Sequence, residues 1–429
     1  MANTNILLLG ADGFIGRHIA FYLRIQGYRV VCSARNTAAL ARAGFETFQA
    51  DLTNPAAATP GFWENPAADC DVIINAAGLL NGTDSQMQAV HIDAPAALYS
   101  AAKKHRVSKL ILISAIGIEA DTPFGATKSK GESAVKNSTL PYVILRPSLV
   151  LADTSYGGSS LLRALSALPF ITPTIGTGAQ EFNPIHANEL AKTVEAAFLH
   201  DKMDDQTVFP CGPERVTQKH ILAALQAWLG RPKTRHIAIP LPLAHIFGWI
   251  GDRLKLGPIS KTAVTQIEQG VSADYTAFHK QSGIKVRGFS QILNARPAGA
   301  QDLWHARLYI LRPVVRFALM FMWLLSGLVG LSIPPEIFLS DMAALGLSDT
   351  TLITIARGAG IMDIGIALGL LLAWKLPYLA LLQLLIVAVY TIIFGLVIPI
   401  LWLEPYGGLL KNIPVLLLIL IHHILEVER

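Results

Sequence analysis

The stretch Asn5–Gly16, with the sequence NILLLGADGFIG, decides the fold of the larger part of this chain. It starts as an uninterrupted apolar run of strand length and passes directly into a turn with three glycines, Gly10, Gly13 and Gly16. A helical pattern and a second apolar run, Arg29–Cys32, follow, so the segment predicts a βαβ unit. Glycines at this spacing permit a tight turn, close approach of a pyrophosphate and close helix–strand packing. Together with the N–H groups of the helix N-terminus, they predict a dinucleotide site.

Further strand-length runs continue this alternation along the chain. Those runs are Glu46–Ala50, Val72–Ala76, Leu110–Ser114 and Tyr142–Arg146. Helical patterns such as Ala94–His105 separate them. Strands that alternate with helices form parallel sheets covered on both faces. The expected fold class is therefore α/β, with a doubly wound parallel sheet.

The end of the second strand indicates which dinucleotide the chain prefers. An acidic residue there would hold the ribose 2′-hydroxyl of NAD and repel a 2′-phosphate. The segment Cys32–Asn36 has no carboxylate and contains Arg35, while Arg17 follows the third glycine. Guanidinium groups form charge-assisted bonds with phosphate. We therefore expect NADP(H) rather than NAD(H), the alternative being that Arg35 is an ordinary solvated surface residue.

These motifs and those that follow resemble the short-chain dehydrogenase/reductase superfamily over about residues 1–295. The likeness is to its atypical, extended branch, which contains the accessory nucleotide-binding subunit of respiratory complex I. It rests on GADGFIG, Asp51-Leu52, Asn75-Ala76-Ala77-Gly78, Ser114, Lys128–Glu132, Leu145–Ser148 and Asn183–Glu189. The resemblance places Asp51 and Leu52 beside the adenine, and Pro147 and Ser148 beside the nicotinamide. The full set expected to bind the cofactor is Gly10, Gly13, Phe14, Ile15, Gly16, Arg17, Arg35, Asp51, Leu52, Ala76, Ala77, Gly78, Lys128, Pro147 and Ser148.

The catalytic residues that the resemblance implies are incomplete. Such enzymes use a Ser, a Tyr that exchanges a proton with the substrate, and a Lys four residues after the Tyr. Ser114 and Lys128 occupy two of these places, but Phe124 stands where the Tyr would be. Tyr99 precedes the serine on an expected helix, so we assign it a structural role. Tyr156, in the expected substrate loop, is either a substitute for Phe124 or a surface residue.

Residues 150–295 are expected to complete this domain as its substrate-binding part. Within it, Pro240–Leu254 is apolar and helical. Three of its side chains, Ile246, Phe247 and Trp249, have three possible roles: lining an apolar substrate pocket, resting on a bilayer surface, or packing in the core. The histidines of this region have no metal-ligand spacing, so no metal is expected; they are His220, His236 and His245.

Composition separates the rest of the chain from this domain. Of 429 residues, 52% are hydrophobic and 15% charged, against about 25% charged in ordinary soluble proteins. Residues 1–312 carry a net charge of +7, and residues 313–429 one of −2. Four apolar runs in the second part are each roughly long enough to cross a bilayer: Pro313–Leu331, Leu352–Trp374, Tyr378–Ile400 and Ile413–Val427. We expect domains at 1–295 and 313–429, joined by a linker at 296–312.

The charges between the runs predict how the chain is oriented. Basic residues lie before the first run and between the second and third, whereas the first-to-second loop has three acidic residues and no basic one. By the positive-inside rule, the N-terminal domain and the C-terminus are expected in the cytoplasm. Three cysteines and no recognisable signal peptide fit a reducing compartment. The expected location is the cell inner membrane. Without a Lys/Arg block, no nucleic-acid partner is expected.

The second part resembles the DoxX-like family of four-helix membrane domains. The likeness rests on Trp323 with Ser326-Gly327, and on Gly358–Gly369. Four ionisable residues lie inside its apolar runs, and such residues are functional candidates: Arg357, Asp363, His422 and His423. We expect Asp363 and His422 at comparable depth, where the pair would bind a quinone oxygen, relay a proton or fasten two helices.

Two functions remain open from the sequence. The first is a membrane-anchored, NADP(H)-binding reductase that acts on a lipophilic substrate such as a quinone. The second is a nucleotide-binding scaffold, assembly factor or redox sensor of a membrane protein complex. Retention of Ser114 and Lys128 favours the first, and Phe124 favours the second.

Overall fold

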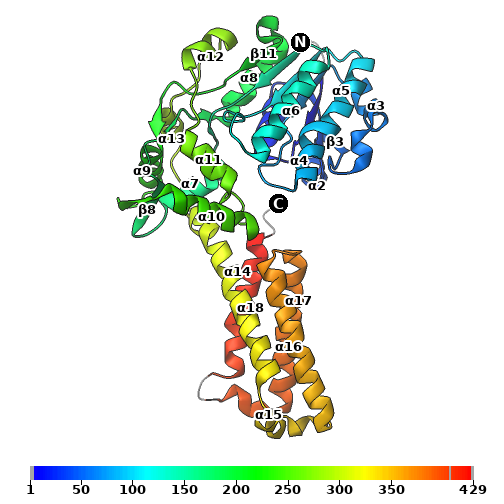
Figure 1. Ribbon diagram of the computed structural model, residues 1–429, viewed down its shortest axis with the longest axis vertical. Helices are drawn as coiled ribbons and strands as arrows, with labels where there is room; N and C mark the ends of the chain where they lie inside the picture. Colours follow the sequence, from blue (N-terminus) through cyan, green and yellow to red (C-terminus); the bar gives the residue numbers. More distant parts are fainter. Residues whose placement is uncertain (1–3, 405–406, 427–429) are drawn as a thin grey trace. The chain divides into compact units, whose positions relative to one another are not determined.

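The computed structural model describes residues 4–404 and 407–426 and divides them into two compact units (Figure 1). The first unit contains the residues up to Asp252 together with Gly257–Leu303, and the second contains Arg253–Leu256 and the chain from Trp304 onward. The boundary in the second half of the chain falls between Leu303 and Trp304. It therefore lies inside the segment expected to be a linker.

A seven-stranded, wholly parallel sheet forms the centre of the first unit and confirms the doubly wound α/β fold. Its strand order is β11-β6-β5-β4-β1-β2-β3. The strands are β1 (Asn5–Leu9), β2 (Arg29–Ala34), β3 (Glu46–Gln49), β4 (Val72–Asn75), β5 (Lys109–Ile113), β6 (Tyr142–Leu145) and β11 (Gln206–Val208). The predicted strands agree within two residues at each end, and β11 is a strand that was not predicted.

Helices cover both faces of this sheet, which is why β1 is apolar throughout. Ile6 and Leu8 face one core cluster, and Leu7 and Leu9 face the other. A strand buried on both faces needs no polar alternation. The helices of this part are α1 (Phe14–Ile25), α2 (Ala38–Arg42), α3 (Pro60–Ala68), α4 (Asp84–Gln88), α5 (Ala94–Lys104), α6 (Pro123–Asn137) and α8 (Ala187–Leu199).

A smaller region of short paired strands and helices completes the first unit. Its strands are β7 (Val150–Leu151), β8 (Ile171–Ile175), β9 (Glu181–Phe182), β10 (Ile185–His186), β12 (Val216–Thr217) and β13 (Arg235–Ile239). Its helices are α7 (Gly158–Ser166), α9 (Gln218–Trp228), α10 (Leu241–Arg253), α11 (Lys261–Gln269), α12 (Tyr275–Ser282) and α13 (Phe289–Asn294). A separate apolar cluster around Leu225 and Phe289 holds the region together.

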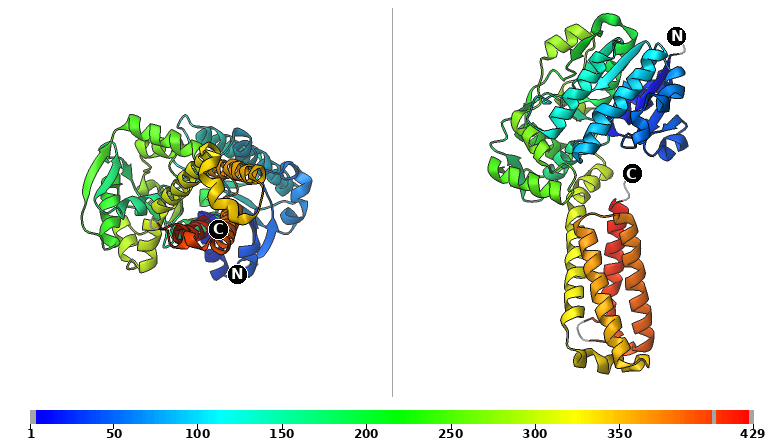
Figure 2. Two further views of the ribbon diagram at one scale, coloured as in Figure 1. Left: turned by 90° about the horizontal axis from the view of Figure 1, so that it is seen from below. Right: turned by 45° about the vertical axis from the view of Figure 1, so that its right-hand side comes forward.

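Within its described residues, the second unit contains four long apolar helices that run side by side (Figure 2), as expected for four membrane spans. They are α14 (Ala300–Ser332), α16 (Asp349–Leu371), α17 (Leu376–Val397) and α18 (Asn412–Glu426), and the short α15 (Pro335–Met342) follows α14. Gly327 of α14 lies against Gly360 of α16, where a Cβ on Gly327 would sit 2.7 Å from the Gly360 carbonyl oxygen. Small residues at such crossings let membrane helices approach closely.

Helix α14 begins well before the predicted first apolar run. The apolar run was predicted to begin at Pro313, but the helix already begins at Ala300. Most of the expected linker is therefore helical, since residues 300–312 are rich in helix-forming Ala, Leu and Arg. The predicted end of the fourth run, Val427, lies outside the described residues.

Candidate functional site

The glycine turn between β1 and α1 has the geometry that a bound dinucleotide needs. Gly10 has φ +70°, a conformation that favours glycine, and a Cβ there would meet the backbone of Ala77. A Cβ on Gly16 would overlap the carbonyl oxygen of Gly10. The turn is closed by the Gly13 N–H, which donates to the Gly10 oxygen at 3.0 Å. This compact turn fits a pyrophosphate at the start of α1, with Gly13 as its N-cap.

The segment after β4 is held beside the glycine turn by buried hydrogen bonds. Asn75 accepts from the Ala77 N–H at 3.1 Å and donates to the Tyr99 hydroxyl at 2.9 Å. Tyr99 is buried on α5, which confirms its structural role. The Ala76–Gly78 backbone is thereby fixed at the carboxyl edge of the sheet, where ligands bind in this class of fold.

Arg35 lies at the end of β2 next to Asp51. Thr53 donates its hydroxyl and its backbone N–H to the Asp51 carboxylate, at 2.7 and 2.9 Å. These bonds lower the pKa of Asp51, and the charge of Arg35 adds a smaller lowering. Arg35 itself is exposed. Its guanidinium is therefore accessible at the edge where the resemblance places the adenosine.

Ser114 belongs to a buried network with residues that the sequence analysis did not single out. Its hydroxyl donates to Glu132 Oε1 at 2.6 Å. Arg146 donates to both oxygens of the same carboxylate, each at 2.8 Å, and also pairs with the exposed Glu119. Because the proton of Ser114 is directed into this carboxylate, its oxygen remains able to accept a hydrogen bond. The bidentate pairing of Glu132 with Arg146 could not be read from a single sequence motif.

Lys128 is buried on α6 and reaches the segment after β4. Its Nζ donates to the carbonyls of Ile113 and Ala77, at 3.2 and 3.4 Å. A Cβ on Gly78 would lie 3.1 Å from this nitrogen. Burial lowers the pKa of Lys128 to about 8, although the charge of Glu132 opposes the shift. The structure thus brings Lys128 together with Ala77 and Gly78, as the resemblance implies.

Phe124 fills the place of the missing tyrosine and packs against a neutral histidine. Its ring meets that of His91 edge to face, with centroids 5.9 Å apart. The His91 Nε2 accepts from the Leu79 N–H at 3.0 Å, so Nδ1 carries the proton toward Thr127, 2.8 Å away. Burial and the charge of Lys128 lower the pKa of His91 to about 3. His91 therefore stays neutral at physiological pH and does not replace the tyrosine as an acid.

We expect nucleotide affinity to fall as the pH rises through about 8. Lys128 is protonated below its lowered pKa and loses its charge above it, so the attraction for a phosphate-bearing cofactor disappears. The measurement is NADPH binding by the full chain between pH 7 and 9.5, followed by nicotinamide fluorescence. Lys128→Met should remove the pH dependence, whereas Lys103→Met, at an exposed position, should keep it. The same dependence of NADPH affinity on pH in the natural chain and in both variants would show that Lys128 does not cause it.

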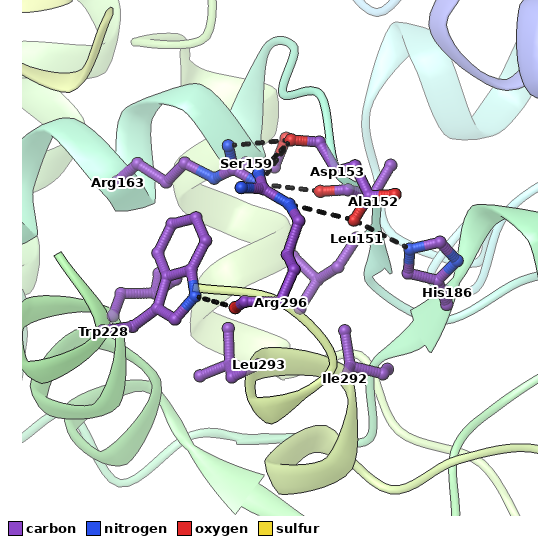
Figure 3. Close-up of a pocket in the computed structure, with 11 residues that line it drawn as sticks. Leu151, Ala152, Asp153, Ser159, Arg163, His186, Trp228, Ile292, Leu293 and Arg296 are labelled. Atoms are coloured by element: carbon purple, nitrogen blue, oxygen red, sulfur yellow. Dashed lines mark hydrogen bonds and ion pairs between the residues drawn. The ribbon is translucent and has the colours of Figure 1, made fainter. Parts of the chain in front are cut away.

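A small pocket lies between α7, α9 and α13, and its arginines are already paired (Figure 3). Arg163 and Arg296 both stack near the Trp228 ring, 5.1 and 5.0 Å from its centroid, and both pair with Asp302. They also donate to backbone carbonyls of residues 152–154. These arginines therefore fasten that loop and do not form an open anion site.

The same loop reaches the glycine turn. Thr154 contacts His18 of α1 at 3.1 Å, and the ring of Tyr156 stacks on Phe14 with centroids 6.3 Å apart. Tyr156 is half exposed. It thus lies beside the start of α1. No sequence signal linked Arg163, Arg296 and Asp302 to this loop, because they come from distant segments.

Arg357 has a structural explanation inside the membrane unit. It donates to the carbonyls of Gly330 and Ile333, both at 2.7 Å, at the C-terminal end of α14. Carbonyls at a helix end lack intrahelical partners, so a guanidinium there satisfies them.

Asp363 and His422 do not form the predicted pair. Asp363 accepts from Ser326 of α14 at 2.7 Å, whereas His422 lies 3.6 Å from Glu426, which is also 3.7 Å from Arg312. Ser326 and Arg312 are 14 residues apart on one helix, which is about 21 Å at 1.5 Å per residue. Asp363 therefore lies at the level of Ser326, whereas His422 lies one turn before Glu426 and so nearer the level of Arg312, and the prediction of comparable depth is wrong. His423, next to His422, is half-buried.

Comparisons with known proteins identify both parts of the chain. Residues 10–166 match the NAD(P)H-binding family, and residues 320–420 match the DoxX-like family. The chain therefore has an NAD(P)-binding Rossmann domain followed by a DoxX-like domain. Four helices among the described residues are long and apolar enough to cross a membrane, and together with the DoxX-like match they indicate a membrane protein.

Two curated relatives confirm the resemblance of the N-terminal part. NADH dehydrogenase [ubiquinone] 1 alpha subcomplex subunit 9, mitochondrial, of Arabidopsis thaliana is 25% identical over 55% of this chain and 60% of its own length. The photosystem II assembly factor Ycf39 of Cyanophora paradoxa is 29% identical over 33% of this chain and 44% of its own length. The chain thus spans only part of each relative.

Solved structures share the fold of the first unit. The Citrobacter sp. triphenylmethane reductase complexed with NADP(H) is 18% identical, with a TM-score of 0.54, over 68% of this chain and 99% of that one. UDP-glucuronic acid 4-epimerase from Bacillus cereus, with UDP-glucuronic acid and NAD, is 19% identical, with a TM-score of 0.52, over 71% and 99%. At these identities the likeness concerns the fold alone.

Proposed function

We propose that this chain is a membrane-bound oxidoreductase that passes hydride from NADPH to a lipophilic acceptor such as a quinone. The observation that carries the proposal is the modified catalytic site. Ser114 and Lys128 are retained at the carboxyl edge of the sheet, while Phe124 removes the acid that ketone reduction requires. An acceptor whose reduced oxygen can take its proton from another source does not need that tyrosine.

Lys128 supports this chemistry as an alternative proton source. Bound NADPH would supply the hydride from its nicotinamide, and the quinone would take up that hydride and one proton to become a quinol. The pKa of Lys128, lowered to about 8 by burial, makes its ammonium a stronger acid than an exposed lysine. Solvent would then return the proton to Lys128.

The proposed preference for NADPH rests on the exposed Arg35 and on Arg17 near the glycine turn. We expect Arg35→Ala to weaken NADPH binding about 10-fold or more, since a hydrogen bond to a charged group contributes about 1.5–3 kcal/mol. NADH binding should change little, because NADH has no 2′-phosphate. Fluorescence titration of both nucleotides measures the difference. Arg42→Ala, on the neighbouring α2, is the control. If NADH already binds the natural chain as tightly as NADPH, the preference does not exist.

We place the chain in a cell inner membrane with its Rossmann domain in the cytoplasm. Basic residues beside the first span and between the second and third spans support this orientation. A reporter fused to the C-terminus that is active only in the cytoplasm should be active. Activity of an export-dependent reporter at that position would reverse the orientation.

The direct test of the function is NADPH oxidation by the full chain in nanodiscs, against a panel of quinones of different tail length. We expect turnover with long-tailed quinones, loss of turnover in Lys128→Met, and normal turnover in Lys103→Met. Tight NADPH binding without turnover on any quinone would overturn the proposal.

One observation favours a second candidate, a nucleotide-binding scaffold of a membrane complex. The hydroxyl of Ser114 is already committed to Glu132, and Phe124 provides no acid. The names of both curated relatives describe components of larger assemblies or their assembly. For a scaffold, NADPH would shift the chain between assembled and free forms on native gels of its own membranes, without being oxidised.

A further inference from the structure

Helix α10 carries its small residues inward and its large apolar residues outward. Ala244, Gly248 and Gly251 are its buried residues. In contrast, Leu243, Ile246 and Phe247 are 41%, 52% and 45% exposed. Their spacing of three and four residues places them on one face of the helix. Of the three roles open from the sequence, core packing is therefore excluded for Ile246 and Phe247.

Close backbone packing fixes this orientation of α10. A Cβ on Gly248 would lie 2.9 Å from the backbone nitrogen of Lys261, and one on Gly251 would overlap the Ile259 carbonyl oxygen. The helix therefore cannot rotate to bury its large side chains, because larger residues do not fit on the inner side. The outward apolar face, defined here by Leu243, Ile246 and Phe247, is a permanent feature of the first unit.

Positive charge lies at the C-terminal end of this face. Arg253 and Lys255 are exposed there beside the acidic Asp252, while Glu268 of α11 pairs with His245 of α10 at 3.1 Å. An amphipathic helix that combines an apolar face with basic residues is the pattern that binds in the interface of a membrane containing anionic lipid.

The chain directly after α10 is joined to the membrane helices. Arg253–Leu256 clusters with the second unit, where the Leu254 carbonyl accepts from Arg316 of α14 at 2.7 Å. Arg316 lies near the end of the first span that is predicted to be cytoplasmic. Since α10 has 13 residues, no part of it is farther than about 20 Å along its axis from this anchor. The outward face is thus tethered within reach of the same bilayer.

We propose that the outward face of α10 inserts in the headgroup region of the bilayer that the membrane helices cross, with a preference for anionic lipid. This inference goes beyond the proposed oxidoreductase and holds for a scaffold as well. The bilayer would bury the Leu243, Ile246 and Phe247 side chains, and the lipid phosphates would pair with Arg253 and Lys255.

The test places an environment-sensitive fluorophore on the face in the full-length chain. Phe247→Cys is made in a Cys70→Ser background, since Cys32 and Cys211 are buried, and is labelled and reconstituted in nanodiscs. The matched control is Ser100→Cys, at an exposed position of α5. We expect a blue-shifted emission at position 247 and several-fold stronger quenching by lipids spin-labelled near the headgroup than at position 100. Quenching should rise with the phosphatidylglycerol fraction.

Equal quenching at positions 247 and 100 would overturn the proposal. A blue shift at position 247 without lipid quenching would also overturn it, because a protein partner or a second copy would then cover the face. Arg253→Gln combined with Lys255→Gln should abolish the dependence on phosphatidylglycerol and keep part of the quenching. NADPH binding is measured on each labelled protein to show that the Rossmann domain is intact.

Discussion

Replacing Gly16 by alanine is expected to weaken nucleotide binding at least about 100-fold, since each lost charge-assisted hydrogen bond costs about 1.5–3 kcal/mol. The added Cβ would overlap the Gly10 carbonyl oxygen, so the start of α1 must move away from the turn. That movement displaces the N–H groups that would receive the pyrophosphate. Isothermal titration of the full chain with NADPH measures the loss.

Gly61→Ala is the matched control for this substitution. Gly61 lies in the first turn of α3, and a Cβ there would meet nothing within 4 Å. Alanine also favours a helix by up to about 1 kcal/mol over glycine. This variant should bind NADPH normally and melt no earlier than the natural chain. Unchanged NADPH affinity in Gly16→Ala would show that the nucleotide does not bind at this turn.

Replacing Glu132 by alanine is expected to cost about 3 kcal/mol of stability or more, because it leaves a largely buried arginine without its main partner. The Glu132 carboxylate accepts a hydrogen bond from the Ser114 hydroxyl and two from the Arg146 guanidinium. Loss of that carboxylate also frees the Ser114 hydroxyl. We expect the melting midpoint of the Rossmann domain to fall by about 10 °C, as followed by hydrogen exchange of β5 and β6 on heating.

Glu119→Ala provides the comparison for Glu132→Ala at the same arginine. Glu119 also pairs with Arg146, but its side chain is 67% exposed, whereas that of Glu132 is 3% exposed. Exposed ion pairs contribute about 1 kcal/mol or less, so this variant should melt close to the natural chain. Equal destabilisation by both substitutions would contradict the buried network.

The sequence predicted the sheet because local patterns suffice for it. Uninterrupted apolar strands, the glycine turn and the intervening helices each depend on residues close in the chain, and together they indicate a doubly wound parallel sheet. The short β11 was missed, since its residues Gln206–Val208 carry no apolar run. The start of α14 was missed because hydropathy marks where lipid begins, not where a helix begins.

The sequence predicted only those residues of the candidate site that belong to a recognisable motif. The glycine spacing indicated Gly10 and Gly16, the family resemblance indicated Lys128, and the structure places all three around one edge of the sheet. It did not indicate the carboxylate beneath Ser114 or the neutral His91 against Phe124. Hydrogen bonds between segments 12 to 36 residues apart depend on how those segments pack.

By itself, the sequence determined a dinucleotide-binding Rossmann domain, a four-helix membrane domain and the absence of the usual tyrosine at Phe124. Glycine spacing, hydrophobic periodicity and hydropathy each depend on residues close together in the chain, so they can be read from the sequence without a structure. Only the tertiary structure decided that Ser114 donates to Glu132, that Asp363 and His422 lie at different depths, and that α10 turns its large side chains outward. Each of these depends on contacts between segments that are far apart in the sequence. Such contacts exist only in the folded chain, so no local sequence pattern reports them.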